Sequence, residues 1–346
     1  MIAFVVFATI VAIFVLELIS IRVSRRITAT CEVDLSLCAP GEEIALRYTV
    51  SNASFMPVLF VGVSIYFEGP VTICESEKWK KLYARDDYSG VYVDRKLFIR
   101  PHRKVTDRVR FAYNKRGLYG IGKVYLETGD FLGFKSNVRS WETDEMIVCT
   151  APLVESTPEF KPLGGLLGEI SVLRFMHEDP CLITGYREYT GREPMKQISW
   201  LQTAKTSSLM VKQQDHTADA DVLVLVDLSA GQIPVMERCL AITRTICEHL
   251  EDVKVSYSMI TNGDLGVSTK GLGRGHLFPI LRAIGLSRMT AYTSFNDAVE
   301  RCIAEKHPDR TFLVISPRID ETLLRKLQTH SEHRIVLFTG EEAFTV

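Results

Sequence analysis

The sequence predicts a multidomain protein with one transmembrane helix, an antiparallel β-sandwich domain and a C-terminal doubly wound α/β domain. Three observations lead to this prediction. The chain opens on an apolar stretch, short runs of alternating apolar and polar residues fill residues 27–140, and buried-strand and helix patterns alternate from residue 220 onward. At 346 residues the chain also exceeds the roughly 250–300 residues at which a single core stops growing.

The apolar stretch Ile2–Ile21 predicts a transmembrane helix over residues 1–21. It holds only three polar residues, and as a helix it would span about 30 Å, the thickness of a hydrocarbon core. A cleaved signal peptide fits less well, because the stretch is long and lacks both a basic start and a small-x-small cleavage site. Lipidation would use Ala29-Thr30-Cys31, where the threonine is unfavourable.

Three arginines set the expected topology. Arg22, Arg25 and Arg26 follow the apolar stretch, and no basic side chain precedes it. Because basic residues flank the cytoplasmic end of a transmembrane helix, we expect an N-terminus outside and a cytoplasmic body. This predicts a single-pass membrane protein.

Residues 27–140 have the pattern of short strands and turns. Glu43–Val50 and Val58–Ile65 alternate apolar and polar positions, and Pro40-Gly41 and Ser51-Asn52 interrupt such runs. Closely spaced strands without a convincing helix favour an antiparallel β-sandwich. Residues 141–219 are expected to form a connector, because prolines and glycines interrupt a weaker pattern there.

Residues 220–346 predict the α/β domain. Val222–Val226 is a fully apolar run, typical of a strand buried on both faces, and Pro234–Leu250 has apolar residues at helical spacing. The later strands and helices are expected at Val255–Ile260, Leu277–Ile284, Phe295–Ala304, Thr311–Ile315, Glu321–Leu327 and Arg334–Phe338.

Composition and motifs favour a binding protein over an enzyme. The formal net charge of -1 argues against a nucleic-acid partner. The eight cysteines form no CxxC pair, so we expect reduced thiols rather than a zinc site. The sequence has no His-Glu-x-x-His, no phosphate loop and no Gly-x-Ser-x-Gly, and the glycine-rich Gly271–Gly275 is expected to be a turn.

Three separated stretches together resemble one protein family. The first is Lys115–Gly122 with Gly129–Phe134, the second runs from Arg187 to Lys212, and the third is Val226–Gly231. They are similar to the membrane-anchored proteins of domain-of-unknown-function family 58, and the resemblance covers nearly the whole chain. It implies a C-terminal domain like the von Willebrand A domain.

The second stretch is the most specific part of the resemblance. Its candidate signature or interaction residues are Arg187, Tyr189, Gly191, Glu193, Trp200 and Lys205. One interpretation places the aromatic residues in a core and pairs the charged residues. The other makes the block an interface, since Arg, Tyr and Trp dominate interaction hot spots. The sequence favours the first without excluding the second.

The third stretch resembles the metal-binding loop of von Willebrand A domains. Asp227 and Ser229 match that loop, and Thr293 could supply its later threonine. Gly231 stands in place of a second serine, and Pro317 stands where an aspartate is usual, with Asp320 the nearest acid. Mg²⁺ needs several well-placed oxygens. We therefore expect weak magnesium binding or none.

Two functions follow as expectations. The first is a membrane-anchored cytosolic interaction or scaffold protein without catalytic activity. The resemblance implies that it acts with a MoxR-type AAA+ ATPase in the assembly or activation of other complexes. The alternative is an adhesion or ligand-binding receptor that uses a metal ion in the α/β domain.

Overall fold

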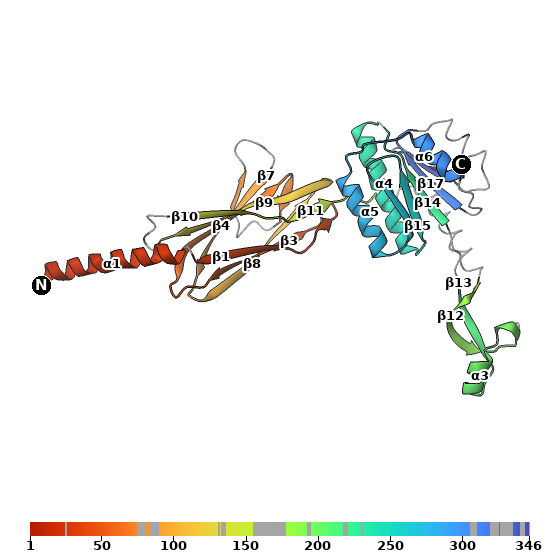
Figure 1. The fold of residues 1–346 in the computed structure, drawn as a ribbon, viewed down its shortest axis with the longest axis horizontal. Coiled ribbons are helices and arrows are strands. Elements are labelled where there is room, and N and C mark those ends of the chain that lie inside the picture. The colour runs from red at the N-terminus through yellow and green to blue at the C-terminus, as the bar shows by residue number, and fades with distance from the viewer. Residues whose placement is uncertain are drawn as a thin grey trace. The chain divides into compact units, whose positions relative to one another are not determined.

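The structure, a computed structural model, describes residues 1–24, 26–74, 80–83, 90–130, 132, 136–154, 178–191, 195–216, 221–229, 231–304, 310–318, 325, 335–339 and 343–345. Figure 1 shows an N-terminal helix, a β-rich body and a C-terminal α/β body. The chain divides into two compact units. The first unit comprises Met1–Pro152 and Ile284–Ser287, and the second comprises Leu153–Ala283 and Arg288–Val346.

The first element is α1 (Ile2–Ser24), which confirms an N-terminal apolar helix. Its segment Phe4–Val23 is long and apolar enough to cross a membrane. Side chains along it, such as Phe7 and Phe14, are exposed because no protein covers them. Only the last turns of the helix meet the β-rich body, where Val23 is buried in the core.

Two sheets form the β-rich body. The first has the order β1 (Ile27–Val33), β3 (Ile44–Asn52), β8 (Arg103–Tyr113) and β5 (Val71–Ile73). The second has the order β2 (Leu37–Cys38), β11 (Met146–Cys149), β9 (Gly117–Gly129), β4 (Val58–Glu68), β7 (Gly90–Ile99) and β6 (Lys80–Tyr83), and β10 (Ser136–Glu142) pairs with β9. All pairs are antiparallel except β2 with β11.

One apolar core joins these sheets. In β3 every second residue is buried, so Leu46 and Tyr48 point inward, and they share a core with Val63 and Ile65 of β4. The alternation seen in the sequence therefore reports which side chains face the other sheet. Strands β10 and β11 carry this body to Cys149, past the boundary at residue 140 that the pattern suggests.

A small hairpin unit lies in the expected connector. It consists of β12 (Glu178–Glu188), the 3₁₀ turn Met195–Gln197, α3 (Trp200–Thr206) and β13 (Met210–His216). The two strands pair antiparallel, and Ile198 forms a bridge to Val211. The connector thus holds regular structure that the sequence pattern does not reveal.

The C-terminal sheet has the order β16 (Val267–Gly271), β15 (Tyr257–Thr261), β14 (Asp221–Val226), β17 (Arg310–Ser316), β18 (Ile335–Thr339) and β19 (Ala343–Thr345). Its four central strands are parallel, and the two edge strands are antiparallel. The helices are α4 (Ile233–Asp252), α5 (Arg274–Leu286) and α6 (Phe295–Ala304).

Strand β14 is buried on both faces, as its apolar run predicts. Leu223 and Leu225 pack against α6 through Phe295 and Val299, and the intervening residues of β14 are buried too. Figure 1 shows α4 across the sheet from α6. The expected helix Glu321–Leu327 lies outside the described residues except for Arg325.

Candidate functional site

The candidate site lies at the carboxyl edge of the parallel strands. Asp227 follows β14, Asn262 follows β15, and Ser316 ends β17. Because β14 lies between β15 and β17, these three residues come to neighbouring positions at the same edge. The chain passes from β14 to β15 on one side and later to β17 on the other. This makes the edge a topological switch point, where open α/β sheets bind ligands.

Both carboxylate oxygens of Asp227 accept hydrogen bonds from the protein. Oδ1 accepts from the backbone N–H of Ser229 at 2.8 Å and from Nδ2 of Asn262 at 3.1 Å. Oδ2 accepts from the hydroxyl of Ser316 at 2.8 Å. The side chain of Asp227 is buried. These donors compensate for the loss of water around a buried charge.

Asn262 connects the same loop at further points. Its Nδ2 also donates to Oγ of Ser229 at 3.1 Å, and its Oδ1 accepts from the backbone N–H of Leu228 at 2.8 Å. The residue is buried. The side-chain NH2 group of Asn262, whose hydrogens carry partial positive charge, therefore bridges the carboxylate of Asp227 and the hydroxyl of Ser229, the two groups that resemble metal ligands.

The backbone of Thr293 is hydrogen-bonded to that of Asn262. The N–H groups of Tyr292 and Thr293 donate to the carbonyl oxygen of Asn262 at 2.8 and 3.1 Å. The side chain of Thr293 itself is exposed. The structure thus brings Asp227 and Ser229 together and places Thr293 on the adjoining loop.

The two departures from the metal-loop pattern lie beside each other. A Cβ atom added at Gly231 would lie 3.1 Å from Cβ of Pro317 and 3.2 Å from the sulfur of Met236. A side chain at position 231 would therefore crowd Pro317. Asp320, the acid that could replace the missing ligand, lies outside the described residues.

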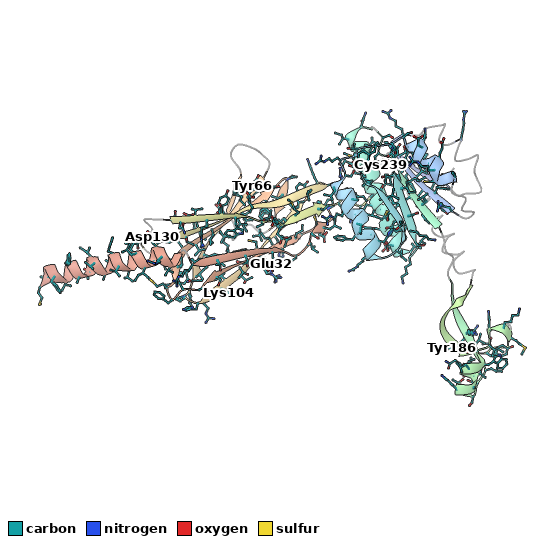
Figure 2. All side chains as sticks on the ribbon, viewed as in Figure 1. Glu32, Tyr66, Lys104, Asp130, Tyr186 and Cys239 are labelled. Carbon is teal, nitrogen blue, oxygen red and sulfur yellow. The ribbon has the colours of Figure 1, made fainter. Side chains whose placement is uncertain are left out.

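The described part of the chain contains no group of three or more His, Cys, Asp and Glu side chains that could hold a metal ion. Cys239 of α4, labelled in Figure 2, interacts electrostatically with Asp227. Burial, and to a smaller extent the Asp227 carboxylate, raises the pKa of Cys239 to about 12. The thiol therefore stays protonated at neutral pH and is a poor nucleophile.

The signature block lies on the hairpin unit. Trp200, the first residue of α3, is 62% exposed, so the interpretation of Trp200 as a core anchor is wrong. The buried residues of the described block are instead Ile198, Ser199 and Val211. Ser199 links the helix to β13, because its N–H donates to the carbonyl of Met210 at 2.8 Å.

The other signature residues surround this small core. Arg187 and Lys205 have exposed side chains, and Tyr189 is half-buried, with its N–H donating to the carbonyl of Leu209 at 2.8 Å. Gly191 has a φ of +88°, a left-handed conformation that favours glycine. Glu193 lies outside the described residues, so the proposed charge pairing through it is not described.

Sequence reasoning missed Asn262 and Ser316. Both follow or end strands that the apolar patterns predict, so their position at the carboxyl edge was available as a signal. Their partnership with Asp227 was not, because it depends on which strands are neighbours in the sheet.

Comparison with family models and with curated proteins finds no match. Solved structures share distant similarity with this chain. One is AvmM, which catalyses macrocyclization in alchivemycin A biosynthesis (14% identity, 38% of this chain, 92% of that chain, TM-score 0.24). Another is a cohesin module of a family 33 glycoside hydrolase from Clostridium perfringens (11% identity, 34% of this chain, 94% of that chain, TM-score 0.23). A third is a CARDB domain from Pyrococcus furiosus (11% identity, 36% of this chain, 91% of that chain, TM-score 0.23).

Proposed function

We propose that this chain is a membrane-anchored interaction or scaffold protein with a cytosolic body, and that it binds a protein partner rather than catalysing a reaction. The exposed apolar surface of the hairpin unit is the observation that carries this proposal. We further propose that its C-terminal domain is of the von Willebrand A type. The partner we propose is a MoxR-type AAA+ ATPase, with which the protein would assist the assembly or activation of other complexes.

The hairpin unit carries several exposed apolar side chains. Trp200 and Leu201 of α3 and Met195 of the preceding turn are all exposed. Tyr186 of β12, labelled in Figure 2, and Leu209 add to this surface. Exposed apolar patches of this kind mark interaction sites, and tryptophan is enriched among the residues that carry binding energy.

The charge around this patch indicates the chemistry of the partner. The described residues between 185 and 212 include four basic residues, Arg187, Lys196, Lys205 and Lys212, and one acidic residue, Glu188. Complementary charge gives specificity and speeds association. A suitable partner surface has an apolar pocket with an acidic rim.

The position of Cys31 within strand β1 argues against cleavage before this residue. Cys31 lies within β1, where it faces Tyr48 of β3, and the buried Ile27 precedes it in the same strand. Cleavage before Cys31 would remove half of that edge strand and part of the core. The exposed Arg22 and Arg26 at the end of α1 support a cytosolic body.

The alternative receptor function has less support. A metal-dependent ligand site needs Asp227 to face an ion, whereas Asn262 and Ser316 already bind both of its oxygens. An ion would have to displace those donors before it could bind a ligand.

Co-purification from detergent-solubilised membranes tests the proposed function. The full-length chain should retain an AAA+ ATPase, identified by mass spectrometry, and the double variant Trp200→Ala with Leu201→Ala should lose it. Val267→Ala is a matched control, because Val267 is 68% exposed on β16. Equal recovery of the ATPase with both variants, or its absence from the parent sample, would contradict the proposal.

A further inference from the structure

One end of the β-sandwich gathers around the last turns of α1. We call it the helix-proximal end and define it as the described residues among 22–28, 52–60, 98–104 and 128–132, with residue 136. Strand registers bring these segments together, because Ile27 pairs with Asn52, Asn52 pairs with Arg103, and Ser136 pairs with Gly129. Figure 2 shows Asp130 of this end close to α1.

The helix-proximal end exposes large apolar side chains. Phe55 lies at the tip of the turn between β3 and β4, and Phe60 lies on β4 with 56% of its surface exposed. Leu59, Phe98 and Leu132 are exposed as well. Contiguous exposed apolar patches mark sites of protein or membrane interaction.

The turn that carries Phe55 is held in place from inside. The side chain of Asn52 donates to the carbonyl oxygens of Met56 at 2.8 Å and of Arg100 at 3.3 Å. His102 in turn donates its N–H to the carbonyl of Ser54 at 3.1 Å. Hydrogen bonds therefore join the two neighbouring turns and hold the backbone around Phe55 in place.

The charge of this end has one sign at the surface. Five basic side chains are exposed there, Arg22, Arg26, Arg100, Arg103 and Lys104. Within the definition given above, the single acidic side chain is Asp130, and it is only 2% exposed. The defined surface thus combines apolar side chains with cations, and the exposed Glu127 borders it beside Phe60 and Ser136.

The contacts of α1 show which part of the helix lies beside the helix-proximal end. Val23 is buried in the sandwich core, and Ile19 packs against it. Glu17 lies beside Asp130 and Leu132. Val23 lies six positions after Glu17 in the helix, which corresponds to about 9 Å along the axis. Leu132 therefore lies beside the final part of the segment that is apolar enough to cross a membrane.

We propose that the helix-proximal end is a lipid-binding surface, seated in the headgroup layer of the same bilayer that α1 crosses. Phe55, Phe60 and Leu132 enter the boundary between headgroups and acyl chains, and the basic side chains contact anionic headgroups. This inference rests on the proposed membrane anchoring of α1. Amphipathic surfaces with aromatic residues and Lys or Arg bind the bilayer interface by both effects.

The observations favour lipid over a protein occupant. The surface is continuous with α1 within one compact unit, so any bilayer around α1 would meet it. Each basic residue near an anionic leaflet adds to the electrostatic attraction. Binding of this surface to the headgroup layer would limit the tilt of the sandwich relative to the membrane.

Photo-crosslinking to lipid tests the proposal. The full-length chain is reconstituted into vesicles of equal parts phosphatidylcholine and phosphatidylglycerol, with p-benzoylphenylalanine in place of Phe60. Leu118 is the matched control, because it is 51% exposed near the start of β9. The other end of β9, at Thr128 and Gly129, belongs to the helix-proximal end. Phe7 of α1 reports the membrane span itself.

The expected result is lipid adducts at positions 7 and 60 and none at position 118. Adducts at position 7 alone would overturn the lipid-binding surface and leave the membrane anchor intact. Absence of adducts at position 7 would contradict the anchor, and with it this inference. Adducts at all three positions would also overturn the proposal, because they would show no preference for the helix-proximal end.

A charge-reversal variant tests the role of the basic side chains. Arg103→Glu with Lys104→Glu should lower the yield of adducts at position 60 several-fold in these vesicles and have little effect in pure phosphatidylcholine. Arg108→Glu is the control, because Arg108 is exposed in the middle of β8. An unchanged yield with the double variant would overturn the proposed contact with anionic headgroups.

Discussion

Asn262 donates its side-chain amide to Oδ1 of Asp227 at 3.1 Å. The same nitrogen reaches Oγ of Ser229, so one neutral side chain connects the two groups that resemble metal ligands. A cation bound there would compete with this amide and with the hydroxyl of Ser316. The hydrogen bonds therefore offer a physical reason for the weak magnesium binding expected from the sequence.

Titration calorimetry with millimolar Mg²⁺ or Mn²⁺ should show no saturable binding to the parent protein. Asn262→Asp should create a site, because it places a second carboxylate beside Asp227 and removes an amide donor. Mn²⁺ should then raise the melting temperature of this variant and leave that of the parent unchanged. Saturable binding to the parent that Asp227→Ala abolishes would show that the loop still works as a metal site.

Asn262→Ala should lower the free energy of unfolding of the α/β domain by roughly 2–4 kcal/mol, because it removes a donor from a buried carboxylate and the acceptor of the Leu228 N–H. Thr293→Ala is the matched control on the adjoining loop. Its side chain is exposed, so a change within about 0.5 kcal/mol is expected. Urea unfolding followed by circular dichroism measures both. Equal losses in the two variants would refute the central role of Asn262.

Trp200→Ala should leave the hairpin unit folded, because the side chain is largely exposed. Ile198→Ala should loosen it, since truncation of a buried isoleucine typically costs roughly 2–5 kcal/mol. Hydrogen exchange of the amides in β12 and β13 reports this unit directly. Faster exchange in the Trp200 variant than in the Ile198 variant would restore the interpretation of Trp200 as a core residue.

Cys74 should stay unlabelled by an impermeant maleimide on intact cells and react after lysis, as expected for a cytosolic body. Cys74 is exposed, whereas Cys149 is buried and is not a useful probe. Burial, and to a smaller extent Glu145, raises the pKa of Cys31 to about 11. The thiolate is the reactive form, so Cys31 should stay slow until the pH approaches that value. Labelling of Cys74 without lysis would reverse the topology.

Local patterns determine much of this fold. The apolar run of α1, the alternation in β3, the continuous apolar run of β14 and the helical spacing of α4 and α6 each report which side chains are buried. Burial has a period that depends on the element alone, so the sequence is sufficient to predict these elements. Where the pattern is weak, as in β12, β13 and β16, the strands are not predictable.

Only the tertiary structure decided what surrounds the candidate residues. Tryptophan in a signature block suggests a core, yet Trp200 is exposed because Ile198 and Val211 already fill the small interior of the hairpin unit. Asp227 and Ser229 match a metal loop, yet their neighbour Asn262 is 33 residues from Ser229 in the sequence. Its position follows from the order of strands β15, β14 and β17. Contacts between distant segments depend on strand order, which no local periodicity records.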